Sequence, residues 1–144
     1  MNNLQNLKVV PAVYPGAIVD NASWTGVAID TLEFDEALVV VQLGAIDIKM
    51  VALKLTECDT SGGVYTDITG LDFSSPDVLP TASDDNGLFG FFVDLRGRKR
   101  YLKIVATGGD GAAGTYLAAT VLLSRAHDLK QTDTGHGFVK SLNA

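Results

Sequence analysis

Several residue types are scarce in this chain of 144 residues, and each scarcity excludes a class of protein. The chain contains one cysteine, Cys58, so no internal disulfide can form, and a domain of this size does not need one. No apolar run reaches the roughly 18 residues that a membrane-spanning helix requires. Residues 1–6 have neither the basic nor the apolar segment of a secretory signal. We therefore expect one domain that is made in the cytoplasm and makes no contact with a membrane.

Motifs for catalysis and cofactor binding are also missing. The sequence has no Gly-x-Ser-x-Gly and no nucleotide-binding fingerprint. Cys58 and Ser61 are possible nucleophiles by residue type, but the spacing supplies no base for either. The tail carries metal-ligand residue types without the spacing of a metal motif: His127, Asp128, Asp133 and His136. We predict a protein without enzyme activity, cofactor or metal.

Charge is distributed unevenly along the chain. Residues 1–95 carry three basic and fourteen acidic side chains, whereas residues 96–144 carry eight basic and three acidic ones. Five of the eleven positive charges lie between Arg96 and Lys103. This cluster is either a solvated hairpin turn or a basic patch that meets an acidic partner surface. Nucleic-acid binding is not expected, because the chain is acidic overall and only Tyr101 interleaves with the basic residues.

The longest apolar pattern spans residues 34–58, and the rest of the chain reads as shorter strands around it. We predict two long strands joined by a turn at residues 43–45. The β-branched run 39–41 predicts that both faces of the first strand are covered. Between Ile46 and Leu55 the alternation changes phase, which indicates a bulge or a strand buried on both sides.

Later segments alternate with period 2 and are separated by turn residues. Residues 88–95 place four large apolar side chains on one face, and Leu88, Gly90, Phe92 and Asp94 on the other. About eight such segments, with no convincing amphipathic helix, predict an all-β chain: an antiparallel β-sandwich or jelly roll with its core at about residues 24–125. Trp24 is either a core anchor, which we favour, or a ring that stacks on a ligand.

The two ends of the chain differ from this pattern. Residues 1–15 contain Pro11 and Pro15, which restrict them to an edge strand or an extended arm. Residues 126–144 are polar. We predict that residues 1–15 and 126–144 are extended arms that make intermolecular contacts.

Three segments in a fixed order carry a resemblance to a known family: residues 28–45, residues 53–68 and residues 98–104. Together they resemble the head decoration (cement) proteins of tailed bacteriophages, small virion proteins with a jelly-roll-like sandwich. The likeness covers about residues 26–125. It implies a protein of the capsid surface that binds the major capsid protein, and a symmetric oligomer, with a trimer favoured and a dimer next. It carries over no catalytic residue.

Candidate partner contacts come from the basic cluster and from the two ends: Arg96, Arg98, Lys99, Arg100, Val9, Val10, Tyr14, His136 and Phe138.

Three other interpretations of the function stay open. A carbohydrate-binding sandwich needs Trp24, Tyr65 or Tyr101 exposed for stacking on sugars. A hydrolase needs a cleft with a perturbed acid or base. A tail or connector protein needs ring symmetry in the assembled particle.

Overall fold

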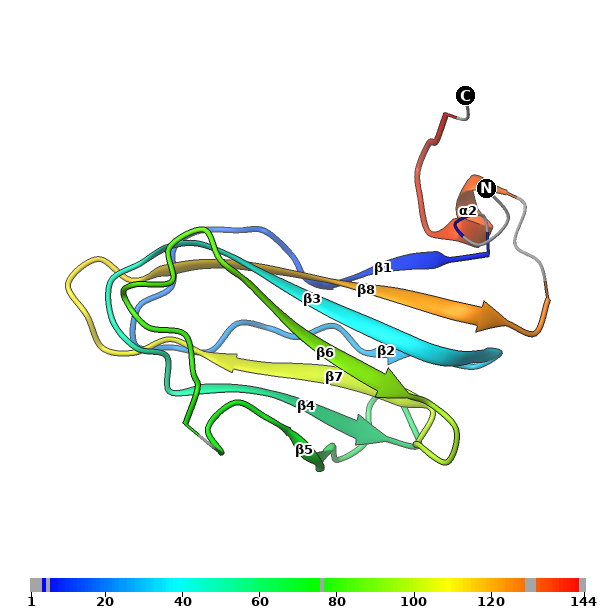
Figure 1. Ribbon diagram of the computed structural model, residues 1–144, viewed down its shortest axis with the longest axis horizontal. Coiled ribbons are helices and arrows are strands. Elements are labelled where there is room, and N and C mark those ends of the chain that lie inside the picture. Colours follow the sequence, from blue (N-terminus) through cyan, green and yellow to red (C-terminus); the bar gives the residue numbers. More distant parts are fainter. Residues whose placement is uncertain (1–3, 5, 76, 129–131, 143–144) are drawn as a thin grey trace.

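The computed structural model describes residue 4 and residues 6–75, 77–128 and 132–142, and these residues form two stacked β-sheets (Figure 1). Sheet A has the strand order β1-β8-β3-β6 and sheet B the order β2-β7-β4-β5, and every pairing is antiparallel. The strands are β1 (Lys8–Val13), β2 (Ile29–Asp30), β3 (Phe34–Ile46), β4 (Ala52–Cys58), β5 (Thr66–Asp72), β6 (Leu88–Asp94), β7 (Tyr101–Thr107) and β8 (Thr115–Ala126).

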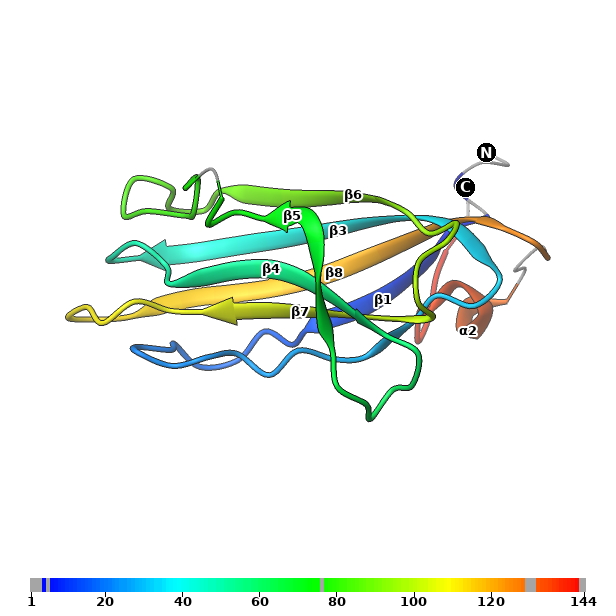
Figure 2. The same ribbon diagram turned by 90° about the horizontal axis from the view of Figure 1, so that it is seen from below.

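This strand order defines a jelly roll. Successive strands alternate between the two sheets, apart from the neighbours β4 and β5, so each sheet is built from strands distant in sequence. The predicted antiparallel sandwich of about eight strands is confirmed in the described residues. Figure 2, turned by 90°, shows the long strands of both layers running along the same axis.

The core lies between the sheets and follows the predicted alternation. Val39 and Val41 of β3 and Val121 of β8 are fully buried, facing Leu53 of β4 and Leu102 of β7. Trp24 is half-buried and packs against this core, as predicted. Burial of alternate side chains from both layers is what holds such a sandwich together.

The predicted turn at residues 43–45 is wrong. Strand β3 continues to Ile46, and its pairing with β8 shifts register between Leu43 and Ile46, which marks a β-bulge. The reversal of the chain comes later, at residues 47–51, so the change of phase in the sequence is a turn between two strands. A glycine followed by a small residue is compatible with both a bulge and a turn, which explains the error.

The described residues near the two ends of the chain meet at the β1 edge (Figure 1). Residues 8–13 are not a free arm, because they pair with β8 as the edge strand of sheet A. The short helix α2 (Asp133–His136) lies against that edge, where His136 Nδ1 is 2.8 Å from the carbonyl oxygen of Leu7. Residues 1–3, 5, 129–131 and 143–144 of the proposed arms lie outside the described residues. Intermolecular contacts of the two ends stay a prediction.

Candidate docking surface

The outward side of sheet A, which we call the outer A face, is built from side chains aligned across its four strands. One row joins Val9, Leu122, Leu38 and Phe92, each paired with its neighbour in register. The next row joins Pro11, Thr120, Val40 and Gly90. These eight positions carry no charge, and Thr120 supplies the only side-chain polar group. A sheet surface of this composition is normally covered.

Exposure on the outer A face rises toward β6. Phe92 is 82% exposed and Leu88 is 68% exposed, although both are large apolar side chains. Leu38, Val40 and Leu122 are half-buried by their neighbours within the sheet. A groove of about 540 Å³ lies over the first row and is lined by Leu38, Phe92, Leu122 and the polar residues at its end. Large exposed apolar patches of this kind mark protein interaction sites.

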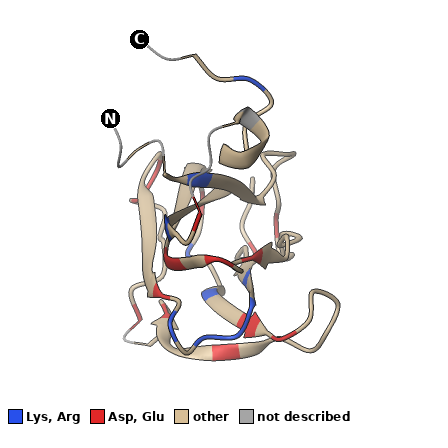
Figure 3. Ribbon diagram, turned by 90° about the vertical axis from the view of Figure 1, so that its right-hand side faces the viewer, with Lys and Arg blue, Asp and Glu red and all other residues tan. Residues whose placement is uncertain are grey.

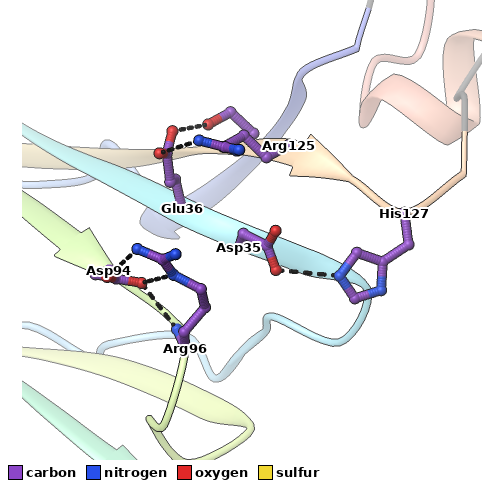
Figure 4. A network of polar contacts seen from close by, with 7 residues as sticks. Asp35, Glu36, Asp94, Arg96, Arg125 and His127 are labelled. Carbon is purple, nitrogen blue, oxygen red and sulfur yellow. Dashed lines mark hydrogen bonds and ion pairs between the residues drawn. The ribbon is translucent and has the colours of Figure 1, made fainter.

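Polar and charged residues line one end of the groove, and Figure 4 shows their contacts. The Arg96 guanidinium donates to both carboxylate oxygens of Asp94, at 2.9 Å and 2.7 Å. Glu36 of β3 accepts hydrogen bonds from two residues of β8, Ser124 at 3.2 Å and Arg125 at 3.4 Å. The guanidinium and the backbone N–H of Arg96 lower the pKa of Asp94 to about 2. The rim therefore carries both signs of charge, already paired.

The outward side of sheet B, the outer B face, is polar and partly covered. Lys54 pairs with Asp67 at 2.8 Å, and the Lys103 ammonium lies 5.3 Å from the centre of the Tyr65 ring. Residues 59–65 fold over this face, so that Cys58 is only 7% exposed although it points away from the core. The charged groups of this face find their partners within the chain.

The basic cluster is largely neutralised by acidic residues of the same chain. Arg100 makes a bidentate pair with Asp30, at 2.9 Å and 2.8 Å, and Arg98 lies 3.5 Å from Glu57, which also accepts the backbone N–H of Lys99. Figure 3 looks onto this end of the sandwich and shows acidic and basic stretches interspersed. Of the two readings of the cluster, this arrangement is the one expected of a solvated turn with internal ion pairs.

The structure separates the other candidate partner contacts. Val9 lies on the outer A face, whereas Val10 points inward and packs against the core, so the two neighbours cannot serve one surface. Tyr14 is 62% exposed just beyond β1. Phe138 is 43% exposed beyond α2, and His136 is held against Leu7. Only Val9 among them belongs to the aligned rows.

The tail histidines take separate positions. His127 Nε2 lies 3.1 Å from Asp35 Oδ1, at the start of β3, whereas His136 contacts Leu7, just before β1. No three His, Cys, Asp or Glu side chains in the described part of the chain gather closely enough to hold a metal ion. No described helix is long and apolar enough to cross a membrane.

The aromatic rings considered for sugar stacking are half-buried. Trp24 packs against the core, and the Tyr65 hydroxyl donates to the carbonyl of Ser61 at 3.0 Å. The Arg100 guanidinium lies over the Tyr101 ring, with its central carbon 5.1 Å from the centre of the ring. These rings make intramolecular contacts and do not form the open aromatic platform that sugar binding needs.

The outer A face was missed by sequence reasoning, although two signals pointed to it. The run 39–41 predicts cover on both faces of β3, and the described residues supply cover for the inner face only. Strand β6 is apolar on both faces, since Leu88 and Phe92 alternate with the core residues. Either signal indicates a second buried surface; the sequence alone cannot show that both belong to one sheet.

The described residues thus define an eight-stranded jelly roll with one apolar outer face. No protein-family model matches the chain, and no curated protein matches it. Among solved structures, the SPBc2 prophage-derived protein YomS is similar, with 13% sequence identity over 82% of this chain and 93% of that chain, and a TM-score of 0.48. The similarity is one of strand arrangement.

Proposed function

We propose that this chain is a non-enzymatic structural protein of a tailed-phage virion, which binds the outer surface of the capsid and stabilises the expanded shell. The observation that carries the proposal is the outer A face, an apolar sheet surface that the described chain leaves uncovered. The segment order that resembles head decoration proteins supplies the choice of partner. The jelly roll is compatible with this role but does not by itself define it.

The physics of the role needs a surface of this kind. Major capsid subunits form junctions that repeat over the shell, so one small protein can occupy many equivalent sites. A protein that binds only the expanded form stabilises that form by mass action. The docking energy comes from burial of apolar side chains of the outer A face such as Leu38 and Leu122, at about 25 cal/mol per Å². The paired charges at the rim contribute little energy and orient the contact.

Co-sedimentation of the purified protein with expanded and unexpanded shells of its own phage tests the proposal. We expect binding to expanded shells only, at a fixed ratio to the major capsid protein. A charge at an exposed position of the outer A face, Phe92→Lys, should abolish binding. The matched control is Val64→Lys, because Val64 is 87% exposed in the loop that covers the outer B face. Absence of binding to both shell forms, or equal loss with both variants, contradicts the proposal.

A further inference from the structure

The four edge strands of the sandwich are protected very unequally. An edge strand presents unpaired backbone groups, and proteins block them with proline, charge, bulges, short length or a covering segment. Strand β1 contains Pro11 and is flanked by α2, with Gly137 so close to the Val9 carbonyl that a side chain there would clash. Strand β2 has only two residues.

The other side of the sandwich has one protected edge and one open edge. Strand β5 is interrupted by a register shift and by Gly70 at φ +86°, and it carries Asp67 and Asp72. Strand β6 has the sequence Leu-Phe-Gly-Phe-Phe-Val-Asp and pairs with β3 in unbroken register. Strand β6 carries one charge, Asp94, at its last position. Among the described edge strands, β6 alone combines regular geometry with no proline, no charge before its last residue and no covering segment.

The phase of the β6 ladder shows which backbone groups are free. Leu43 N donates to Gly87 O at 3.0 Å and Leu95 N donates to Asp35 O at 2.8 Å. In an antiparallel pair, alternate residues exchange both hydrogen bonds with their partner. The backbone groups of Leu88, Gly90 and Phe92 therefore point away from β3. No residue that the structure describes pairs with them.

We propose that β6 is a homodimerisation edge: β6 of a second copy of this chain pairs with it antiparallel across a twofold axis, and the two A sheets join into one. The sequence of the strand is self-complementary in this arrangement. With Gly90 opposite Gly90 of the partner subunit, Phe92 stands opposite Leu88 of the partner subunit, and about six backbone hydrogen bonds form. Phe92 and Leu88, 82% and 68% exposed in one copy, then bury each other as a cross-strand pair.

The surroundings of β6 leave room for the incoming strand. A hollow of about 340 Å³ lies on the open side of the sandwich, lined by Gly90, Phe91 and Phe92 and by residues 70–73, 75 and 78. Aspartates of the two copies are not brought together, because Asp94 would stand opposite Asn86 of the partner subunit. This edge pairing closes after two copies, so it favours a dimer over the trimer that the family resemblance implies.

Dimerisation also changes the size of the docking surface. Four strands at about 4.8 Å spacing and about seven residues at about 3.3 Å give one outer A face an area of roughly 400 Å². A standard interface takes about 800 Å² from each partner. Joining two A sheets supplies roughly that area. This consequence rests on the proposed function, whereas the dimer itself does not.

The mass of the full chain in solution, measured by sedimentation over a range of concentrations, tests the dimer. We expect twice 15.2 kDa for the unchanged protein. Gly90→Lys should give 15.2 kDa, with the dissociation constant raised at least about 100-fold, because two like charges would meet at the twofold axis. The side chain fits in one copy, since the atoms nearest an added Cβ are 3.6 Å and 3.8 Å away. The control is Thr120→Lys, in the same row but inside the sheet, which should remain dimeric.

A cross-link provides a second measurement that does not depend on the lysine variant folding. Opposed Cα atoms in a hydrogen-bonded antiparallel pair are about 5.5 Å apart, within reach of a disulfide. Gly90→Cys should therefore form a covalent dimer under mild oxidation, and Thr120→Cys should not. A monomeric unchanged protein at about millimolar concentration overturns the inference. So does a dimer unaffected by Gly90→Lys, or equal cross-linking of the two cysteine variants. Shell binding by a monomeric protein would overturn the dimer and leave the proposed function standing.

Discussion

The two outer faces of this sandwich show how differently one chain can treat equivalent surfaces. On the outer B face, Lys54 pairs with Asp67 and Lys103 lies over Tyr65, while residues 59–65 cover Cys58. On the outer A face, the central rows are uncharged and nothing in the described chain covers them. The outer B face is complete within one molecule. Under the proposed function, the outer A face becomes complete when another molecule buries it.

The largest expected effect comes from placing the same charge on the central strand of each face. Leu122→Lys on β8 should weaken shell binding at least about 100-fold, because it buries an unpaired charge in the interface. The matched change on β7, Val105→Lys, should alter binding less than about twofold. Both residues are half-buried, so the substitutions are comparable in the free chain. Binding isotherms on expanded shells measure the difference, and similar losses would end the distinction between the faces.

A smaller effect separates the two sides of strand β3. Val39 is fully buried between the sheets, so Val39→Ala should lower the free energy of unfolding by about 2 kcal/mol through lost contacts and a cavity. Val40 lies on the outer A face, and Val40→Ala should cost less than about 1 kcal/mol. Urea unfolding measures both values. Equal destabilisation would mean that the outer A face is already buried in the free protein.

Acid should lower the stability that the Asp94–Arg96 ion pair contributes at the rim of the outer A face. Because Arg96 holds the pKa of Asp94 at about 2, below its ordinary 3.8, ionised Asp94 stabilises the folded chain above pH 3.8. This contribution is lost as the pH falls toward 2. Thermal unfolding of Asp94→Asn should therefore show a shallower loss of stability between pH 4 and pH 2 than the unchanged protein. Ser124→Ala, which removes a neutral rim group, should keep the full slope; identical slopes in all three proteins would refute the assignment.

The smallest expected effect is that of salt. Contacts made by apolar rows are not screened, so shell affinity should change less than about threefold between 50 and 500 mM NaCl. Docking through the basic residues 96–103 would instead weaken steeply with salt. A steep loss of affinity in sedimentation assays would move the contact away from the outer A face.

The fold was predictable because local alternation determines it. Residues 88–95 and 101–107 alternate so regularly that strands and their inner faces follow from the sequence. The turn at residues 43–45 was mispredicted, because a bulge and a turn have the same local signal there.

The candidate surface was much less predictable, since it depends on register between distant strands. Val9, Leu38, Phe92 and Leu122 meet in one row only after four strands are paired. The same limit applies to the basic cluster. Arg100 reads as free charge in the sequence, and its partner Asp30 lies 70 positions away. Contacts between residues far apart in the sequence determine both the apolar row and the ion pair of Arg100.

Covalent footprinting of the protein, free and bound to expanded shells, tests the central claim most directly. A carbene reagent labels exposed side chains of any type, so both outer faces report in one experiment. We predict that labelling of Val9, Leu38 and Leu122 falls on binding, while labelling of Val64 and Val105 stays unchanged. Protection of the outer B face with continued labelling of the outer A face would contradict the account.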